Sequence, residues 1–361
     1  MAKQSLLTDL HQRNGAVFVE QDGWLVPEHF GDLAAEYESV RKSAGLFDWS
    51  HRALLQFTGA DRVSFLQGML SNDLRPLKLF DGQQATILTQ QGKVIADVRV
   101  LCAMNSIYLD FWEPLKDKIL AHLNRYLVAD DVEISDPSDQ WKMLSLQGAS
   151  AQNMLGEVFA HAELPSELNR HGMVQFDDAP VCVVRADHTG HNGFDLIVQD
   201  AQLLGLANQL TKLGASWVGE SAQNILRVEA GMPRYGVDFS EENLLLEVGL
   251  ENAYSYTKGC YLGQEVVERI RSRGHVNRKL CGLLIDGAMP ANADHRIFAD
   301  DHEVGKITSS VISLALDRPI AMGYVHKDFC TPGTRLTLRH GVQSIAATVS
   351  QLPFVSPAVS S

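Results

Sequence analysis

The sequence is poor in cysteine and lacks the short motifs of several common enzyme classes. Only five of its 361 residues are cysteine, and none forms a CxxC pair. We therefore expect neither a disulfide framework nor a zinc site built from paired cysteines. No GxxxxGK[ST], GxSxG, HExxH or GxGxxG segment occurs. The common nucleoside triphosphatase, hydrolase, zinc protease and dinucleotide-binding folds thus lose their usual support.

Long hydrophobic runs are also missing. Apolar stretches such as residues 281–285 are far shorter than the roughly 20 residues needed to cross a bilayer. The first nine residues contain no apolar segment of the kind found in secretory signals. We therefore expect a protein without a membrane partner in the reduced cytoplasm, where thiols stay free.

The composition is that of an acidic globular protein. Hydrophobic residues make up 45% and charged residues 21%, and the formal net charge is −13. An acidic surface of this kind argues against direct nucleic-acid binding, because phosphate neutralisation needs basic patches. At roughly 150 residues per domain, the length predicts two or three domains.

Hydrophobic periodicity predicts an α+β protein with antiparallel sheets. Period-2 alternation predicts strands, and i, i+3, i+4 spacing predicts helices. The predicted strands cover residues 53–58, 84–89, 94–101, 106–111, 141–147, 180–186 and 194–199. The predicted helices cover residues 33–44 (with Gly45 as C-cap), 61–70, 115–126, 201–213 and 221–230. The order of strands and helices favours ferredoxin-like units.

The last part of the chain has a different pattern. From Lys279 onward, short β-like runs alternate with glycine, proline and aspartate, which predicts a small all-β domain. We expect the tail from Pro353 to be frayed. The predicted domains are residues 1–148, an α+β region; residues 149–278, a second α+β region; and residues 279–361, a β-barrel.

The most specific segment is residues 258–265, which read Lys-Gly-Cys-Tyr-Leu-Gly-Gln-Glu. Alternation predicts a strand just before it, and Gly263 is placed to cap a helix that begins at Gln264. Cys260 would then lie near Lys258 and a helix N-terminus, and both favour a thiolate. Such a thiolate could act as a nucleophile, a redox sensor or a metal ligand. The alternative is a small cysteine that only fills space in a loop, and we read Cys102, Cys182, Cys281 and Cys330 in that way.

This segment resembles the KGCYxGQE motif of the YgfZ family. Its eight positions include Lys258, Gly259, Cys260, Tyr261, Gly263, Gln264 and Glu265. Residues 45–51, 226–231, 305–310 and 321–325 also resemble landmarks of the wider glycine-cleavage T-protein superfamily. The resemblance implies a T-protein-like cloverleaf of two ferredoxin-like α+β units and a C-terminal β-barrel. It also implies a site for tetrahydrofolate or a folate derivative, with Arg227, Lys258, Asp97 and His191 as folate-binding candidates and no metal ligands.

Two departures from the T-protein pattern bear on mechanism. The resemblance aligns the catalytic aspartate of the T-protein with Ala96, whose methyl group cannot carry a proton. It aligns a pterin-binding glutamate with His191, and a neutral imidazole accepts fewer hydrogen bonds than a carboxylate. Asp97, which follows Ala96 in an alternating strand, should face a cleft or water. His51 and Asp48 are expected to make local hydrogen bonds.

The resemblance implies an accessory protein rather than a glycine-cleavage enzyme. Such a protein would bind folate and use Cys260 to support assembly or repair of iron–sulfur clusters in client enzymes, and so affect tRNA modification indirectly. Its partners would be folate and iron–sulfur client or assembly proteins. The alternative is a tetrahydrofolate-dependent one-carbon transferase, an aminomethyltransferase or a demethylase, with Asp97 as its carboxylate.

Overall fold

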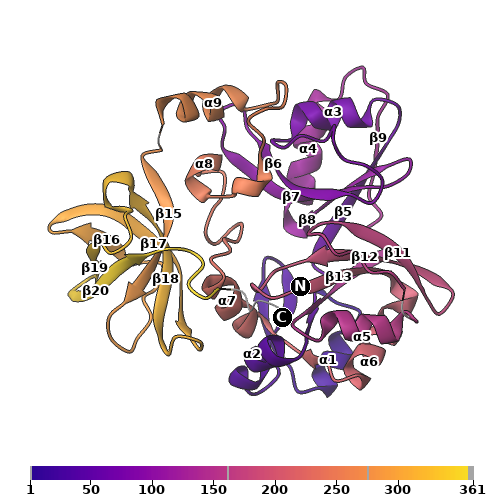
Figure 1. Ribbon diagram of the computed structural model, residues 1–361, viewed down its shortest axis with the longest axis horizontal. Coiled ribbons are helices and arrows are strands. Elements are labelled where there is room, and N and C mark those ends of the chain that lie inside the picture. Colours follow the sequence, from indigo (N-terminus) through magenta and orange to yellow (C-terminus); the bar gives the residue numbers. More distant parts are fainter. Residues whose placement is uncertain (1, 161, 275, 357–361) are drawn as a thin grey trace.

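The chain folds into two sheet-and-helix units and a barrel, arranged around a common centre (Figure 1). The computed structural model describes residues 2–160, 162–274 and 276–356. Each unit has its own apolar core, and a further apolar cluster fills the centre where the units, α7 and the barrel meet. The predicted α+β class with a C-terminal β-barrel is confirmed.

A small N-terminal sheet and the helices α1 and α2 precede the first unit. The elements are β1 (Lys3–Gln4), α1 (Thr8–Arg13), β2 (Val17–Gln21), β3 (Trp24–His29) and α2 (Leu33–Lys42), with sheet order β1-β3-β2. Asp32 caps α2 by accepting from the backbone N–H groups of Ala34 and Ala35. The helix ends at Lys42 rather than at residue 44. Gly45 is not its cap but the first residue of β4, where a Cβ would lie 2.5 Å from Val40 and 2.7 Å from Val218.

The first α+β unit is a five-stranded sheet with two helices. Its elements are β5 (Arg52–Thr58), α3 (Arg62–Met69), β6 (Gly82–Leu88), β7 (Val94–Cys102), β8 (Ile107–Trp112), the 3₁₀ turn η1 (Glu113–Leu115), α4 (Lys116–Tyr126) and β9 (Glu133–Ser135). The strand order is β6-β7-β8-β5-β9. Without the edge strand β6, this is the ferredoxin-like arrangement that the sequence predicts. Leu66 of α3 and Ile119 and Leu123 of α4 belong to the unit's apolar core.

The second α+β unit repeats that connectivity. Its elements are β4 (Gly45–Asp48), β10 (Trp141–Gln147), α5 (Ala151–Val158), β11 (His171–Phe176), β12 (Ala179–Ala186), β13 (Gly193–Gln199), α6 (Asp200–Lys212) and β14 (Ser216–Trp217). The strand order is β11-β12-β13-β10-β4-β14. Strand β4 inserts between β10 and β14, because the chain passes through this sheet before it builds the first unit.

This order corrects the predicted domain division at residues 148 and 149. Strands β4 and β10 precede that division, yet β10 pairs with β13 along its whole length. A cut at residue 148 would divide one sheet. The two units are therefore interleaved in sequence, with residues 52–135 forming the first and residues 45–48 and 141–217 the second.

Three helices and a 3₁₀ turn connect the second unit to the barrel, across the top and centre of Figure 1. They are α7 (Glu220–Glu229), α8 (Leu245–Val248), η2 (Glu251–Ala253) and α9 (Gln264–Arg273). The predicted start of a helix at Gln264 is confirmed, and Gly263 precedes it with a φ of 86°. The strand predicted just before the motif is wrong: within the described part of the chain, residues 254–263 contain no strand.

The barrel closes on itself with strand order β15-β18-β17-β16-β19-β20. Its elements are β15 (Arg278–Ile285), β16 (Arg296–Ala299), β17 (His302–Ser313), β18 (Arg318–His326), the 3₁₀ turn η3 (Lys327–Phe329), β19 (Arg335–His340) and β20 (Gln343–Ser350). Closure leaves no unpaired sheet edge. The tail from Pro353 was predicted to fray. Its described residues, 353–356, are instead fixed to α7, because the backbone N–H groups of Phe354 and Val355 donate to Glu229 O at 2.9 and 3.1 Å. Residues 357–361 lie outside the described residues.

Among the described residues, no helix has both the length and the apolar character that a membrane span requires.

One buried cation joins the two α+β units. Arg99 on β7 lies 2.6 Å from Asp110 on β8 and 2.6 Å from Asp195 on β13, and both carboxylates are fully buried. Burial alone would raise the pKa of Asp195, but His188 and Arg99 lower it well below its usual range. The same two carboxylates raise the pKa of Arg99 against the effect of its burial. The buried charges of Arg99, Asp110 and Asp195 thus balance one another only when the two units are packed together.

Arg99→Met is expected to reduce the free energy of unfolding by about 3–5 kcal/mol, because it leaves two buried carboxylates without their shared cation. Urea denaturation at neutral pH measures this loss. Lys42→Ala is the control, since its exposed pair with Glu38 on α2 should contribute less than about 1 kcal/mol. A loss below about 1 kcal/mol for Arg99→Met would contradict the role assigned to Arg99.

A buried histidine forms a second link across the same seam. His171 on β11 donates from Nε2 to Cys102 O at 3.1 Å, and its backbone N–H donates to Phe80 O at 2.9 Å. Its ring also packs edge-on against Phe80. Burial lowers the pKa of His171 to about 4, so the imidazole is neutral at physiological pH.

Between about pH 6.5 and 4, His171 should therefore be protonated in the unfolded chain but neutral in the folded chain. Stability should fall as the pH is lowered through this window, by about 3 kcal/mol for His171. Urea denaturation at several pH values measures the slope. His171→Gln should make the slope shallower, whereas His302→Gln, a change at an exposed position on the barrel, should not. Equal slopes for wild type and His171→Gln would refute this account.

Candidate functional site

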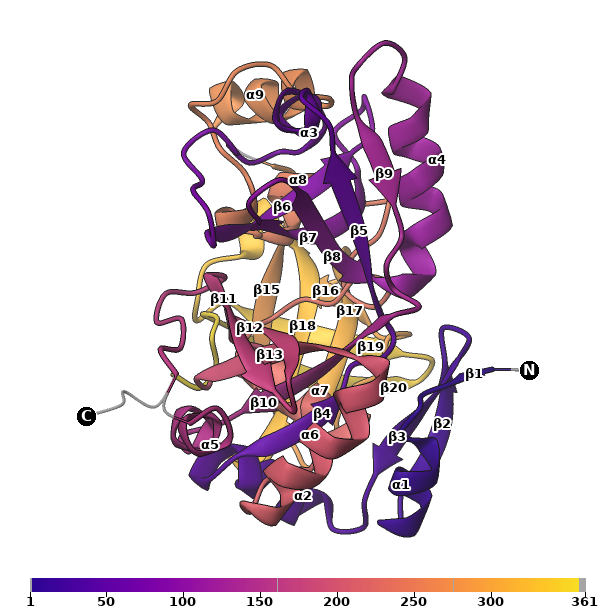
Figure 2. The same ribbon diagram turned by 90° about the vertical axis from the view of Figure 1, so that its right-hand side faces the viewer.

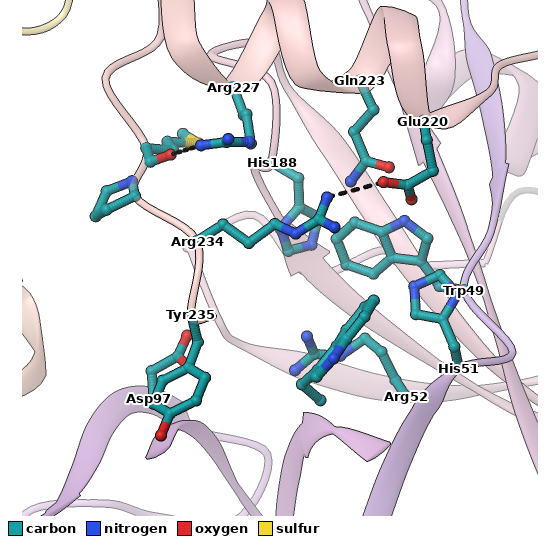
Figure 3. A pocket seen from close by; sticks show the side chains of 13 residues that line it. Trp49, His51, Arg52, Asp97, His188, Glu220, Gln223, Arg227, Arg234 and Tyr235 are labelled. Atoms are coloured by element: carbon teal, nitrogen blue, oxygen red, sulfur yellow. Dashed lines mark hydrogen bonds and ion pairs between the residues drawn. The ribbon is translucent and has the colours of Figure 1, made fainter. Parts of the chain in front are cut away.

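A cavity of about 150 Å³ lies where the two α+β units face α7 (Figure 3). Its walls come from the β4–β5 turn, β7, the end of β8, the β12–β13 loop, α7 and the loop after α7. The lining residues are Trp49, His51, Arg52, Asp97, Trp112, His188, Glu220, Gln223, Arg227, Met232, Pro233, Arg234 and Tyr235. The cavity therefore combines segments that are far apart in the sequence.

Helix α7 supplies the polar wall. Glu220, Gln223 and Arg227 recur at i, i+3 and i+7, which places them on one face of the helix. The apolar face, with Ala222 and Ile225, packs into the central cluster. The amphipathic pattern of α7 therefore directs its polar side chains into the cavity.

Aromatic rings form the opposite wall. The ring centroids of His188 and Trp49 are 4.1 Å apart, and those of His51 and Trp112 are 4.4 Å apart. The guanidinium of Arg234 lies over the Trp112 ring at 5.5 Å. Flat rings beside fixed cations suit a planar, polar heterocycle, which can stack and hydrogen-bond at its edge.

The basic side chains of the cavity already have acidic partners. Arg52 lies 2.6 Å from Asp110, Arg234 lies 2.8 Å from Glu220, and His188 lies 2.9 Å from Asp195. These pairs fix the positions of the basic side chains before any ligand arrives.

Asp97 differs from the other charged groups of the cavity. It is half-buried beside Tyr235, and within the described residues it has no ion-pair partner. Burial raises the pKa of Asp97, although Arg52 opposes the shift. Burial also lowers the pKa of His51 to about 4, so that ring is neutral at physiological pH. The cavity thus holds a carboxyl group that is free of an ion pair within the described residues and whose raised pKa makes it a better proton acceptor than an ordinary aspartate.

The register of β7 revises the interpretation of Ala96. Ala96 is fully buried in the core of the five-stranded unit, whereas its neighbour Asp97 lines the cavity. Successive residues of a strand face opposite sides of the sheet. A carboxylate at position 96 would therefore point into the apolar core. The absence of one there is no evidence against proton transfer in the cavity, because position 97 is the one that faces it.

Arg227 lies in the cavity wall and ties α7 to the barrel. It pairs with Asp238 at 2.7 Å and donates to Ser309 Oγ at 2.8 Å. Its Nε is buried and has no hydrogen-bond partner among the described residues. This unpaired donor could bond an acceptor atom of a ligand. His191, the other residue assigned from the T-protein pattern, is half-buried outside the cavity lining, and the histidine that this loop places in the wall is His188.

Asp48 and His51, which lie three residues apart, have different surroundings. Asp48 is buried and accepts from His11 at 2.8 Å and from Ser50, so its predicted hydrogen bonding is confirmed. Burial would raise the pKa of Asp48, but the bonds from His11, Ser5 and Ser50 lower it to about 2. His51 instead faces the cavity.

The KGCYxGQE segment lies apart from the cavity, since none of residues 258–265 lines it. Lys258 is buried, and its ammonium donates to the backbone oxygens of Gln67, Leu70 and Asn72 at 2.6–2.8 Å. Burial lowers the pKa of Lys258 to about 8. Its three N–H donors are all used to hold the end of α3. Lys258 therefore anchors the loop to the first unit. Its roles in tuning Cys260 or contacting folate stay predictions.

Of the remaining motif residues, some are packed against neighbours and others are exposed to solvent. Tyr261 is buried under the Lys258 ammonium, which lies 4.9 Å from its ring. A Cβ at Gly263 would lie 2.6 Å from Thr89 O, so only glycine fits there. Gln264 is half-buried, whereas Gly259, Cys260 and Glu265 are exposed. Among the described residues, no group of three or more His, Cys, Asp or Glu side chains could hold a metal ion.

Most residues of the cavity wall carry no local signal in the sequence. These unpredicted site residues are Trp49, Arg52, His188, Glu220, Gln223, Arg234 and Tyr235. The spacing of Glu220, Gln223 and Arg227 was the available signal, but a polar helix face usually meets solvent. The other residues come together only through the packing of separate units.

Comparison with known proteins gives a consistent family assignment. The model of the GCVT N-terminal domain matches residues 7–258, and that of the glycine cleavage T-protein C-terminal barrel domain matches residues 278–356. An aminomethyltransferase of Rubrobacter xylanophilus is 31% identical over 98% of this chain and 94% of its own. An aminomethyltransferase of Chlorobium phaeovibrioides is 30% identical over 99% of this chain and 100% of its own.

A solved structure has the same architecture along the whole chain. The glycine cleavage system aminomethyltransferase T from Bartonella henselae superposes with a TM-score of 0.92 and 25% identity, covering 99% of both chains. The predicted T-protein-like fold is thus confirmed, and the chain belongs to the glycine cleavage T-protein family.

Proposed function

We propose that the central cavity binds tetrahydrofolate and that the protein transfers a one-carbon unit to or from it. The observation that carries this proposal is Asp97, a half-buried carboxyl group with a raised pKa that makes no ion pair within the described residues, in a cavity walled by aromatic rings. The aminomethyltransferases among the relatives support it. The likeness favours the transferase alternative over the accessory role.

The residues present suit such a ligand. The rings of Trp49, Trp112 and Tyr235 offer stacking surfaces for a flat bicyclic head group, and the unpaired Arg227 Nε offers a donor to its edge. The cavity of about 150 Å³ is smaller than the roughly 300–1,000 Å³ that encloses a drug-sized molecule. We therefore expect it to take the head group, with the tail of the ligand outside.

When bound, tetrahydrofolate would supply nitrogen atoms that carry the one-carbon unit. The chain would supply proton transfer, orientation and exclusion of water. Asp97 would take a proton from the ligand or the donor amine, and its raised pKa brings it nearer the working pH. Arg52 and Arg234 hold fixed positive charge at the wall through Asp110 and Glu220, and they would orient Asp97 and the donor. The rings would keep bulk water from the reacting atoms.

Asp97→Asn is expected to reduce kcat roughly 10²–10⁴-fold, because the amide cannot accept the proton. Tetrahydrofolate binding should change less than about threefold, since the amide is nearly the same size. One-carbon transfer from an aminomethyl or N-methyl donor, followed by mass spectrometry of the folate product, measures the rate. Asp301→Asn, at a side chain 93% exposed on the barrel, is the control and should leave kcat unchanged. Full activity of Asp97→Asn would contradict the proposal.

A second candidate function rests on Cys260. Its thiol is exposed on a loop that Lys258 fixes from one side and Gly263 from the other. A fixed, accessible thiol is what a YgfZ-type protein would present to an iron–sulfur client in the cytoplasm. The finer resemblance to that family, the effect on tRNA modification and the cytoplasmic location all remain parts of this second proposal.

Cys260→Ala and Asp97→Asn should separate the two functions. If the protein is a transferase, Cys260→Ala should keep at least half of the wild-type kcat, because the thiol lies outside the cavity lining. If it supports cluster repair, Cys260→Ala should fail to restore a [4Fe–4S] enzyme in cells that lack this protein, whereas Asp97→Asn should restore it. Thr257→Ala, a change at the exposed neighbouring loop position, is the matched control for both measurements.

A further inference from the structure

Two cysteines that neither proposed function uses lie together on the barrel. Cys281 is on β15, and Cys330 directly follows η3. Both were expected to be buried packing residues, but the structure leaves both half-exposed and free. Both pack against the apolar core of the barrel as partly buried members. Solvent can therefore reach them.

Their sulfur atoms converge on one rung of the sheet. Lys279 of β15 pairs with Val325 of β18. The Cys281 thiol lies 3.5 Å from Lys279 O, and the Cys330 thiol lies 3.1 Å from Val325 O and 3.3 Å from His326 O. Both thiols thus contact carbonyl oxygens on this rung or next to it, although 49 positions separate them in the chain. The two thiols are therefore close enough for each to shift the pKa of the other.

The surroundings shift the pKa values of the two thiols in opposite directions. A hydrogen bond from Cys281, with support from Lys279, lowers the pKa of Cys330 to about 7, while burial and Asp328 oppose this shift. The same pairing and burial raise the pKa of Cys281 well above its usual range. One thiol is therefore suited to react as a thiolate near neutral pH, and the other stays protonated beside it. This asymmetry is typical of attacking and resolving cysteines.

We propose that Cys281 and Cys330 form an oxidisable pair that a hydroperoxide converts into a disulfide between β15 and the segment after η3. In the first step the Cys330 thiolate attacks the peroxide, so that an S–O bond forms and the O–O bond breaks. The oxygen leaving group takes up a proton, and Cys330 becomes a sulfenic acid. In the second step Cys281 attacks that sulfur, the S–S bond forms, and water leaves. The two thiols lose two electrons, which reduce the hydroperoxide.

The position of the pair gives the disulfide a structural consequence. Strand β15 begins at Arg278, which pairs with Glu247 of α8, and Lys327 N donates to Asn277 O at 2.9 Å. The link would therefore fasten the junction between the barrel and the connecting helices. It would also close a long loop, which restricts the unfolded chain and raises the urea midpoint of the oxidised protein.

The test treats the full-length protein with equimolar hydrogen peroxide, blocks free thiols with N-ethylmaleimide, and maps peptides by mass spectrometry. We expect a Cys281–Cys330 peptide two mass units below the sum of its reduced parts, with the other three cysteines alkylated. Dithiothreitol should reverse the link. Cys260→Ala, which removes the exposed motif thiol, should form it equally well. Alkylation of all five cysteines, or a link that involves Cys260, would overturn the proposal.

A second variant tests the pairing without relying on the disulfide. In Cys281→Ala, the midpoint of the pH dependence of Cys330 alkylation should move above its wild-type value near 7, because the hydrogen-bond donor is lost. Peroxide should then leave Cys330 as a sulfenic acid that dimedone captures. A midpoint equal to that of the wild type would show that the thiols act independently and would refute the proposal. Circular dichroism of the variant checks that the barrel remains folded.

Discussion

The buried guanidinium of Arg99 holds the two α+β units together. It lies between Asp110 and Asp195, and each of these carboxylates has a second partner that lines the cavity. Asp110 also pairs with Arg52, and Asp195 also pairs with His188. Arg52 and His188 are thus the two ends of one chain of polar contacts whose middle is buried in the seam. The geometry of the site therefore depends on the same contacts that hold the units in register.

Helix α7 links the cavity to the barrel, so the geometry of the site also depends on how the barrel packs. Glu229 at its end accepts from Tyr37 of α2 at 2.6 Å and from Ser313 of β17 at 2.5 Å. Arg227, two residues earlier, pairs with Asp238 and reaches Ser309 of the same strand. Figure 2 shows α7 in front of the barrel strands and beside the second unit. One short helix thus carries the polar wall of the cavity and fixes the barrel against it.

Local patterns allowed most elements to be predicted but not their assembly. Strand β10 was predicted at its observed bounds, because an apolar run flanked by polar turns is a local signal. The pairing of β4 with β10 joins residues about 100 positions apart, and no local pattern encodes it. The same limit applies to the cavity. Arg234 and Trp112 meet only when the loop after α7 crosses the end of β8.

The KGCYxGQE segment shows how a motif can support a site from outside it. A Cβ at Gly92 would lie 2.9 Å from Val266, and Gly263 is packed against Thr89 O, so the β6–β7 turn and the start of α9 leave no room for side chains between them. Strand β7 leaves that turn and reaches the cavity at Asp97. The motif therefore braces the strand that carries the carboxyl group. Packing accounts for Lys258 and Gly263 in this way, but it makes no demand on the exposed side chain of Cys260. Packing therefore leaves the identity of residue 260 unexplained.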